Sequence, residues 1–365
     1  MNRRELLGAL GTLGATAALC GPVELTRRTV LRGLQAEPTD RDVLDWEITA
    51  ETYGREVGVV VPDRLLGQVV ADLGEVAHVL DRSLSEATRS RMLRVAGRLS
   101  AVSAVSLVAT GEFAAGRRWW RTVRQAAEQA GDGELEVFAL GQQAMLALYG
   151  GHTQEQVVSL ADHAIAVGDG RACAGTASAW ATRAQALARW GRLQEARAAL
   201  DEVWDLFARL SGAVGAGQDS WFGYPEHKLR HTESYVHTWL GDTRRAWTAQ
   251  DRVLALCPAD NYRGRAQVHL HRALCLLQDG EVAEGLAHAV ATVTALPRAA
   301  RSDRFVQDVA LSVLEAVPGA VHEVPGDDVA QLRTLVGPRA LPSGRSSGGD
   351  VPGDGDPACG RTGGG

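Results

Sequence analysis

The chain has 365 residues and a formal net charge of −6 at pH 7; 45% of its residues are hydrophobic and 5% are aromatic. This length suits two average domains or one long repeat array, and the apolar content is that of a globular protein. The acidic balance without a basic run argues against a nucleic-acid surface, and no apolar stretch reaches the roughly 18 residues of a membrane span. The five cysteines form no CxxC pair, which argues against a disulfide framework or a zinc knuckle.

The amino-terminal segment, residues 1–37, allows two interpretations. Arg3 and Arg4 precede a short apolar run, as in a twin-arginine export signal. However, the bulky Leu19 directly before Cys20 disrupts both a signal-peptide cleavage site and a lipoprotein site. We therefore expect a linker helix in a cytoplasmic protein, with export by the twin-arginine route as the alternative.

Residues 38–99 carry apolar positions at helical spacing and predict the amino-terminal helices of an array. One helix begins near Asp40, and another begins at Pro62, because proline is tolerated in the first turn of a helix. A third is capped by either Ser83 or Ser85, whose hydroxyls can accept a hydrogen bond from the first turn.

A helix–turn–helix pattern repeats along residues 100–300, and a glycine marks each turn. The steps between successive turn glycines are 40, 40, 50 and 39 residues. Glycine suits the end of a helix because it adopts the left-handed conformation without a steric penalty from Cβ. A recurring period of this size is typical of helical-repeat solenoids. The turn glycines are Gly111, Gly151, Gly191, Gly241 and Gly280.

Two columns of side chains follow the turn glycines. Five residues after the glycine the residue is small, which permits a close crossing of two helices. Nine residues after it the residue is apolar and is expected to fill the space between neighbouring pairs. Gln156 and Gln250 break these columns. The small residues are Gly116, Ala196, Ala246 and Gly285. The apolar residues are Trp120, Leu160, Leu200 and Ala289.

The longest step between turn glycines is explained by a glycine-rich loop over residues 211–219. The segment Trp221-Phe222-Gly223-Tyr224 follows this loop and is the most aromatic stretch of the chain. Aromatic side chains beside such a loop can form either a lid over a ligand or a plug over the hydrophobic core. Both interpretations stay open at this point.

The carboxy-terminal part of the chain changes character after the repeats. Residues 301–340 predict capping helices, one over residues 301–317 and a shorter one from Asp327 to Val336. Residues 341–365 are dominated by glycine, serine, proline and aspartate, a composition that buries too little apolar surface to fold. We expect a disordered tail there.

The recurring glycine–small–apolar pattern resembles tetratricopeptide repeats in a looser form. Over about residues 1–335, the chain is similar to the C-terminal sensor module of actinobacterial XRE-type helix-turn-helix regulators. In that family a DNA-binding domain precedes an arginine-led linker, whereas here Met1 falls at the linker, so the chain resembles the sensor module alone. The stretches that carry this similarity are Gly111-Glu112-Phe113, Trp221-Phe222-Gly223-Tyr224, Leu240-Gly241-Asp242 and Arg263-Gly264-Arg265-Ala266.

The resemblance implies an all-α, right-handed superhelical solenoid of antiparallel helix pairs. It also implies a cytoplasmic, non-enzymatic regulatory or adaptor protein that binds a peptide, a small signal or a partner protein in transcriptional or developmental signalling. A separate DNA-binding regulator and a second copy of the chain are compatible partners. Direct nucleic-acid binding and membrane insertion are not expected. An exported binding protein is the alternative function, and a solenoid hydrolase is a third.

Tetratricopeptide arrays bind extended peptides on the concave face made by the first helix of each pair, at fixed spacings before each turn glycine. In the fourth repeat, Lys228 and His231 could hold a peptide carboxylate through charge-assisted hydrogen bonds. The alternative is that these are ordinary solvated helix residues. The lining positions implied by the resemblance are Arg98, Phe138, Met145, Ser178, Gln185, Lys228, His231, Tyr235, Thr238 and Gln267.

Signals for chemistry in the sequence are weak. His227 and His231 lie four residues apart beside Glu226, so the two imidazoles could face one metal ion. However, no HExxH motif and no third ligand at fixed spacing accompany them. No GxSxG, Walker or GxGxxG motif stands ahead of a predicted helix. We therefore expect no catalytic residues, no metal site and no cofactor.

Overall fold

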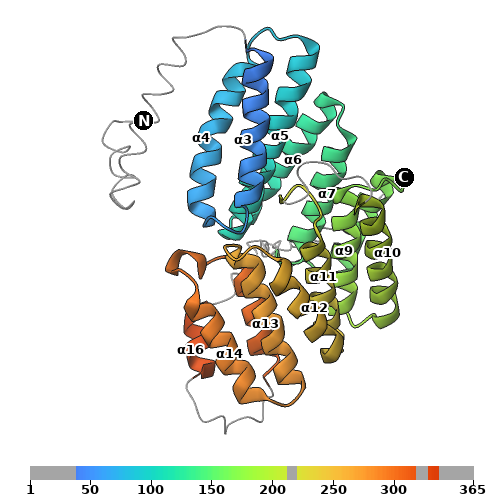
Figure 1. The fold of residues 1–365 in the computed structure, drawn as a ribbon, viewed down its shortest axis with the longest axis vertical. Coiled ribbons are helices and arrows are strands. Elements are labelled where there is room, and N and C mark those ends of the chain that lie inside the picture. Colours follow the sequence, from blue (N-terminus) through green and yellow to red (C-terminus); the bar gives the residue numbers. More distant parts are fainter. Residues whose placement is uncertain (1–37, 212–219, 318–327, 337–365) are drawn as a thin grey trace, which may run out of the picture.

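The structure is a computed structural model that describes residues 38–211, 220–317 and 328–336. Across these ranges the chain forms 14 α-helices and no β-strand, so the predicted all-α class is confirmed. The linker or signal expected at residues 1–37, the loop after residue 211 and the tail at 341–365 lie outside the described residues. Figure 1 shows the helices following one another around an arc, from α3 in blue to α16 in red.

The first two helices begin where their capping signals stand. α3 (Asp40–Glu56) opens with a capping box, in which Thr39 and Asp42 satisfy each other's backbone N–H groups. The Asp42 carboxylate accepts the Thr39 N–H at 2.7 Å. α4 (Pro62–Leu80) opens at the proline. Both predicted starts are confirmed.

α5 (Glu86–Ala109) is capped by Ser85 rather than Ser83, because the Ser85 hydroxyl accepts the backbone N–H of Thr88. Within the described ranges, α5 is the one helix long and apolar enough to cross a membrane, yet 72% of its apolar window is buried inside the protein. It therefore packs as a core helix. The boundary expected between residues 99 and 100 is wrong, because it falls inside this helix.

The array continues as the pairs α5–α6, α7–α8, α9–α10, α11–α12 and α13–α14. The two helices of each pair pack together, and each first helix also packs on the first helix of the next pair. α5, α7, α9, α11, α13 and α15 therefore form one continuous row, which we call the first-helix row. The bounds of the array are α6 (Phe113–Ala130), α7 (Gly133–Ala147), α8 (Gln154–Gly168), α9 (Ala174–Arg189), α10 (Leu193–Ser211), α11 (Glu226–Trp239), α12 (Thr243–Leu256), α13 (Tyr262–Gln278) and α14 (Val282–Ala295).

All five turn glycines adopt a left-handed backbone, as predicted. This conformation turns the chain directly from the first helix of a pair into the second. Their φ angles are +93° at Gly111, +77° at Gly151, +77° at Gly191, +73° at Gly241 and +91° at Gly280.

Replacing Gly241 by alanine is expected to lower the free energy of unfolding by about 1–2 kcal/mol, because Cβ crowds the following carbonyl in the left-handed conformation. No other atom lies within 4 Å of the position that Cβ would take, so the loss is conformational alone. Gly67→Ala in α4 is the matched control, with equally open surroundings and no positive φ. We expect it to stabilise the helix by about 0.5–1 kcal/mol. Urea titration followed by circular dichroism measures both, and a neutral Gly241→Ala would contradict the strained turn.

The second helix pair is shifted by one residue relative to the others. α8 begins three residues after its turn glycine, whereas α6, α10, α12 and α14 begin two residues after theirs. Thr153 caps α8, and the Gln156 side chain accepts the Thr153 N–H at 3.0 Å. The two columns therefore pass through Val157 and Ala161, which expose no surface. The core position predicted for Leu160 is wrong, since Leu160 is 37% exposed.

The small-residue column permits the close crossings that we predicted. A Cβ on Gly116 would lie 2.8 Å from Cγ2 of Val108, so α5 and α6 need the glycine there. Gln250, which broke the apolar column, is nevertheless fully buried. Its Nε2 donates to Oγ1 of Thr238 at 3.4 Å, so a polar pair replaces the apolar contact.

Two carboxy-terminal helices follow the pairs. α15 (Arg304–Glu315) starts three residues later than predicted, because Arg298–Ala300 form a short 3₁₀ helix and Asp303 caps α15. α16 (Asp328–Val336) matches the predicted short helix. α15 packs on α13, and α16 packs on α14, which extends the apolar core of the last pair.

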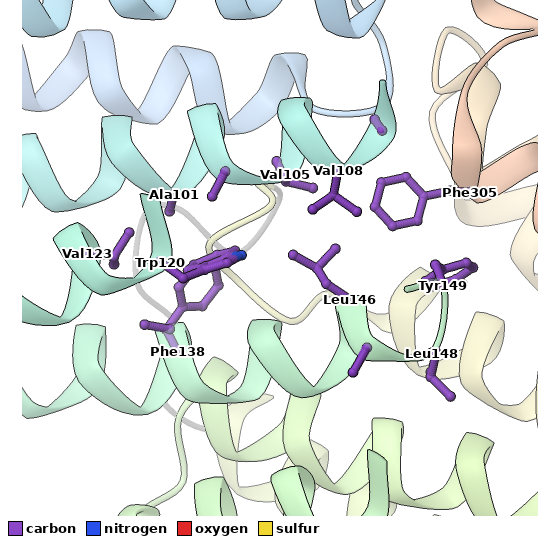
Figure 2. Close-up of a cluster of buried hydrophobic side chains, with 14 of the residues drawn as sticks. Ala101, Val105, Val108, Trp120, Val123, Phe138, Leu146, Leu148, Tyr149 and Phe305 are labelled. Atoms are coloured by element: carbon purple, nitrogen blue, oxygen red, sulfur yellow. The ribbon is translucent and has the colours of Figure 1, made fainter. Parts of the chain in front are cut away.

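Aromatic side chains fill the core between α5, α6, α7 and α15. Figure 2 shows Trp120 beside Phe138 at one end of this cluster and Phe305 beside Tyr149 at the other. The Tyr149 and Phe305 rings meet edge to face, with centroids 4.8 Å apart. The cluster thus joins α15 to helices from the beginning of the array.

The aromatic segment after the glycine-rich loop packs as a plug over this core. The Trp221 and Phe222 rings contact Phe138, with centroid distances of 5.1 and 5.5 Å. The backbone N–H of Trp221 donates to the Gly54 carbonyl at 3.0 Å and ties the segment to α3. Among the two interpretations left open by the sequence, the packing supports the plug.

Candidate functional site

A cavity of about 220 Å³ lies against the first-helix row. The loops after α3 and α12 and the aromatic segment form the rest of its wall, and the exposed Arg55 and Pro258 mark where it reaches the surface. This space can hold several water molecules or one small organic ligand. Each helix of the first-helix row contributes to the wall, through Val105, Met145, Gln185, Lys228, Gln267 and Phe305 among others.

The cavity brings together six of the ten predicted groove residues, from four helices of the row. The Ser178 hydroxyl accepts a hydrogen bond from Nε2 of Gln142 at 3.3 Å. Gln267 Nε2 donates to the Tyr149 hydroxyl at 3.2 Å and to the Phe305 carbonyl at 3.1 Å, which holds its amide against the wall. The six are Met145, Ser178, Gln185, Lys228, His231 and Gln267.

Two of the predicted groove residues lie beneath or beside the plug instead. Phe138 is 5% exposed and is covered by Trp221 and Phe222. The Arg98 guanidinium lies 5.3 Å from the centre of the Phe222 ring and pairs with Glu51 at 3.5 Å. Neither side chain is part of the cavity wall.

The other two lie in the second half of α11, where neighbouring helices bury both. Tyr235 is 1% exposed and stacks on Trp239, with ring centroids 3.9 Å apart. Thr238 exposes no surface, and its hydroxyl donates to the Ser234 carbonyl at 2.7 Å. Both are packing residues, because α11 is enclosed there by α9, α12 and α13.

Lys228 is the most distinctive polar group of the wall. Its ammonium donates to the backbone carbonyls of Trp221 and Gly223 at 2.7 and 2.8 Å, and so holds the plug segment in place. Burial disfavours the charged form and lowers the pKa of Lys228 to about 7. The short hydrogen bonds to two carbonyls favour the ammonium over the neutral amine.

One further polar atom of the wall, Oε1 of Gln142, is buried and has no hydrogen-bond partner among the described residues. Burial lowers the pKa of His231 to about 4, so its ring is neutral at pH 7. His231 therefore cannot supply the positive charge suggested by the sequence, although its nitrogen can take part in a neutral hydrogen bond.

Among the described residues, the cavity wall carries positive charge and no acid. No aspartate or glutamate of the described ranges lines it. Arg263 is neutralised by the buried Asp303 at 2.7 Å, and Arg55 faces Glu51 at 4.0 Å. Lys228 is the cation of the described wall for which no described carboxylate lies within ion-pair distance.

The groove positions implied by the repeat family omit one column of polar residues that lines the cavity. Gln142, Thr182 and Thr232 all line the wall, and each stands nine residues before a turn glycine. This recurrence is visible in the sequence, and it lies one residue from a spacing that the repeat family uses. The sequence therefore contains this column, but the spacings implied by the repeat family do not include it.

Across residues 38–211, 220–317 and 328–336, no three histidine, cysteine or acidic side chains come close enough to hold a metal ion. No protein-family model matches the chain, and no curated protein matches it.

Proposed function

We propose that this protein is a non-enzymatic regulatory or adaptor protein that binds a small signal or the end of a peptide in the cavity beside the first-helix row. The observation that carries the proposal is that the first helices of five successive pairs, together with α15, all line one cavity. Repeat proteins use side chains at such equivalent positions to build binding surfaces. Amide and hydroxyl groups on an otherwise apolar wall are typical of ligand pockets.

We further propose that the helix pairs form a right-handed, tetratricopeptide-like superhelix. The left-handed glycines at recurring positions and the packing of each first helix on the next support this arrangement. A cytoplasmic location and a separate DNA-binding regulator as partner belong to the same proposal, because they rest on the resemblance to sensor modules.

A cavity-filling substitution tests the binding function. Ala181 lines the wall and is 6% exposed, so Ala181→Leu places additional carbon atoms into the ligand space. We expect this variant to bind at least about tenfold more weakly than the wild type, which corresponds to about 1.4 kcal/mol. Ala208→Leu is the control, since Ala208 is an exposed alanine on α10.

The measurement starts from the small molecules and peptides extracted from the host. The purified chain is incubated with this extract and re-isolated by gel filtration, and retained compounds are identified by mass spectrometry. Each compound is then titrated calorimetrically against the wild type and both variants. Compounds lost from Ala181→Leu alone support the cavity, whereas retention of the same compounds by all three proteins, or of none by the wild type, would overturn the proposal.

A further inference from the structure

Lys228 has one hydrogen-bond donor left for a ligand. An ammonium carries three N–H groups, and two of them are used by the carbonyls of Trp221 and Gly223. The side chain is partly exposed, and it lines the cavity. The third N–H is therefore available to a molecule that enters this space.

The positive charge at Lys228 predicts that the ligand is an anion of low charge. A cation that is partly withdrawn from water is less favourable unless an opposite charge accompanies it. None of the carboxylates in residues 38–211, 220–317 and 328–336 does so, and Arg263 is already neutralised by Asp303. One remaining N–H fits a single carboxylate, whereas a phosphate dianion needs several donors.

The Gln142 side chain needs a hydrogen-bond donor rather than an anion. Its Oε1 is buried without a donor, although its Nε2 is bonded to Ser178. A buried acceptor that lacks a partner is unfavourable, so a ligand that brings an N–H gains by satisfying it. Gln185 and Gln267 add amide groups to the same wall. The ligand is thus expected to carry an amide as well as an acid.

We propose that the cavity binds a small carboxylate that also carries an amide, such as an N-acyl amino acid or the C-terminal residue of a peptide. Its carboxylate is held by the Lys228 ammonium, and its N–H is donated to Oε1 of Gln142. The inference rests on the proposed function, because it names the ligand class of the same cavity. A carboxylate next to Lys228 stabilises its ammonium form. At a pH where Lys228 of the free protein is neutral, binding is therefore accompanied by the uptake of a proton.

The sign of the pH dependence follows from this coupling. Burial places the pKa of the free Lys228 at about 7, and a bound carboxylate raises it. Below pH 7 the ammonium is already present, so the affinity is highest there. Above pH 7 binding requires proton uptake, and the affinity falls by up to about tenfold per pH unit until the raised pKa of the complex is reached.

Histidine, cysteine and tyrosine side chains also line the wall, and burial moves the pKa of four of them away from this pH window. Burial lowers the pKa of His231 to about 4 and raises that of Cys257 to about 11 and that of Tyr149 to about 12. Burial also raises the pKa of Tyr224. His227 also lines the wall and is tested by its own variant. The groups that face the cavity besides Lys228 are Arg55, Tyr149, Tyr224, His227, His231, Cys257 and Arg263.

The test uses N-acetyl amino acids, each paired with its uncharged C-terminal amide. Calorimetry at about pH 6.5 and about pH 8.5, in buffers of different ionisation enthalpy, gives the affinity and the number of protons taken up. The wild type is expected to bind the acids at least about tenfold more tightly than the amides. At the higher pH, the acids should bind at least about tenfold more weakly and with proton uptake.

Four variants assign the effect to Lys228. Lys228→Met should lose the preference for the acid. Lys228→Arg should keep the preference and lose the pH dependence, because a guanidinium stays charged. His227→Gln should keep both properties. Arg118→Met removes an exposed charge on α6 and serves as the control for net charge. Lys228→Arg also keeps the test valid if Lys228→Met fails to fold, which thermal melting shows.

Three results would reject the inference. Equal binding of acids and amides by the wild type, or undiminished preference in Lys228→Met, would reject the inference and leave the proposed function standing. Absence of binding by every acid would also reject it. The proposed function would still stand in that case if another compound is bound by the wild type and lost from Ala181→Leu.

Discussion

Replacement of Gly175 by alanine is expected to destabilise the protein by about 3 kcal/mol or more, because the added carbon would overlap with the backbone of a neighbouring helix. A Cβ on Gly175 would lie 2.6 Å from the carbonyl carbon of Val137 and 2.7 Å from Cα of Phe138. From the other side, a Cβ on Gly141 would lie 2.5 Å from the Gly175 carbonyl oxygen. Backbone atoms cannot rotate away as a side chain can, so α7 and α9 would have to separate.

Urea titration followed by circular dichroism measures the loss. Gly67→Ala is the control, since it adds the same methyl group to a helix with nothing within 4 Å. Separation of α7 from α9 would also move Gln142 away from Ser178, so Gly175→Ala should weaken ligand binding in the cavity as well. A loss below about 1 kcal/mol would mean that the two helices do not approach this closely.

Removal of the Asp303 carboxylate is expected to lower the free energy of unfolding by about 3–5 kcal/mol, because it leaves a buried arginine without its counter-ion. The Asp303 side chain is 0% exposed and pairs with Arg263 at 2.7 Å. It also accepts the Tyr262 hydroxyl at 2.9 Å and caps α15 through the Phe305 N–H at 3.0 Å. One carboxylate therefore joins the start of α13 to the start of α15.

Asp303→Ala is compared with Asp251→Ala, which breaks an ion pair with Arg272 in which the aspartate is 74% exposed. The exposed pair should contribute at most about 1 kcal/mol. If the unpaired charge is the main cause, the double variant Arg263→Met/Asp303→Ala should be less destabilised than Asp303→Ala alone. Equal losses for Asp303→Ala and Asp251→Ala would contradict the buried network.

Contacts between distant parts of the chain complete the cavity wall. Gln267 of α13 donates to Tyr149, which follows α7, and Arg189 of α9 pairs with Asp308 of α15 at 3.1 Å. Both members of that ion pair are largely buried. The last helices therefore support the same wall as the middle pairs, and elements from most of the described chain line the cavity.

Local signals were sufficient to predict most helix boundaries. Thr39, Pro62 and the turn glycines act within a few residues of themselves, through a capping hydrogen bond, a restricted φ or a left-handed turn. Such effects are read directly from the order of residues. The same reasoning missed the one-residue shift at α8, because the Thr153 cap competes with the earlier start that the repeat period suggests.

The candidate site was predicted in part. The spacing implied by the repeat family located Ser178, Gln185 and Gln267, because equivalent positions of successive pairs face the same side. The same spacing also selected Tyr235 and Thr238, which neighbouring helices bury. The sequence shows that a residue shares a helix face with others, but burial of that face depends on the neighbours that pack there.

The sequence by itself determined the all-α class, the helix pairs and their turns, because these depend on backbone preferences and hydrogen bonds between near neighbours. Only the tertiary structure decided the closure of the cavity, the contact of Gly141 with Gly175 and the state of Lys228. These features join residues from separate pairs, and they depend on distances that no local signal specifies. Lys228, the single lysine of the chain, was already a predicted carboxylate contact, and the tertiary structure added its two carbonyl partners and its place in the cavity wall.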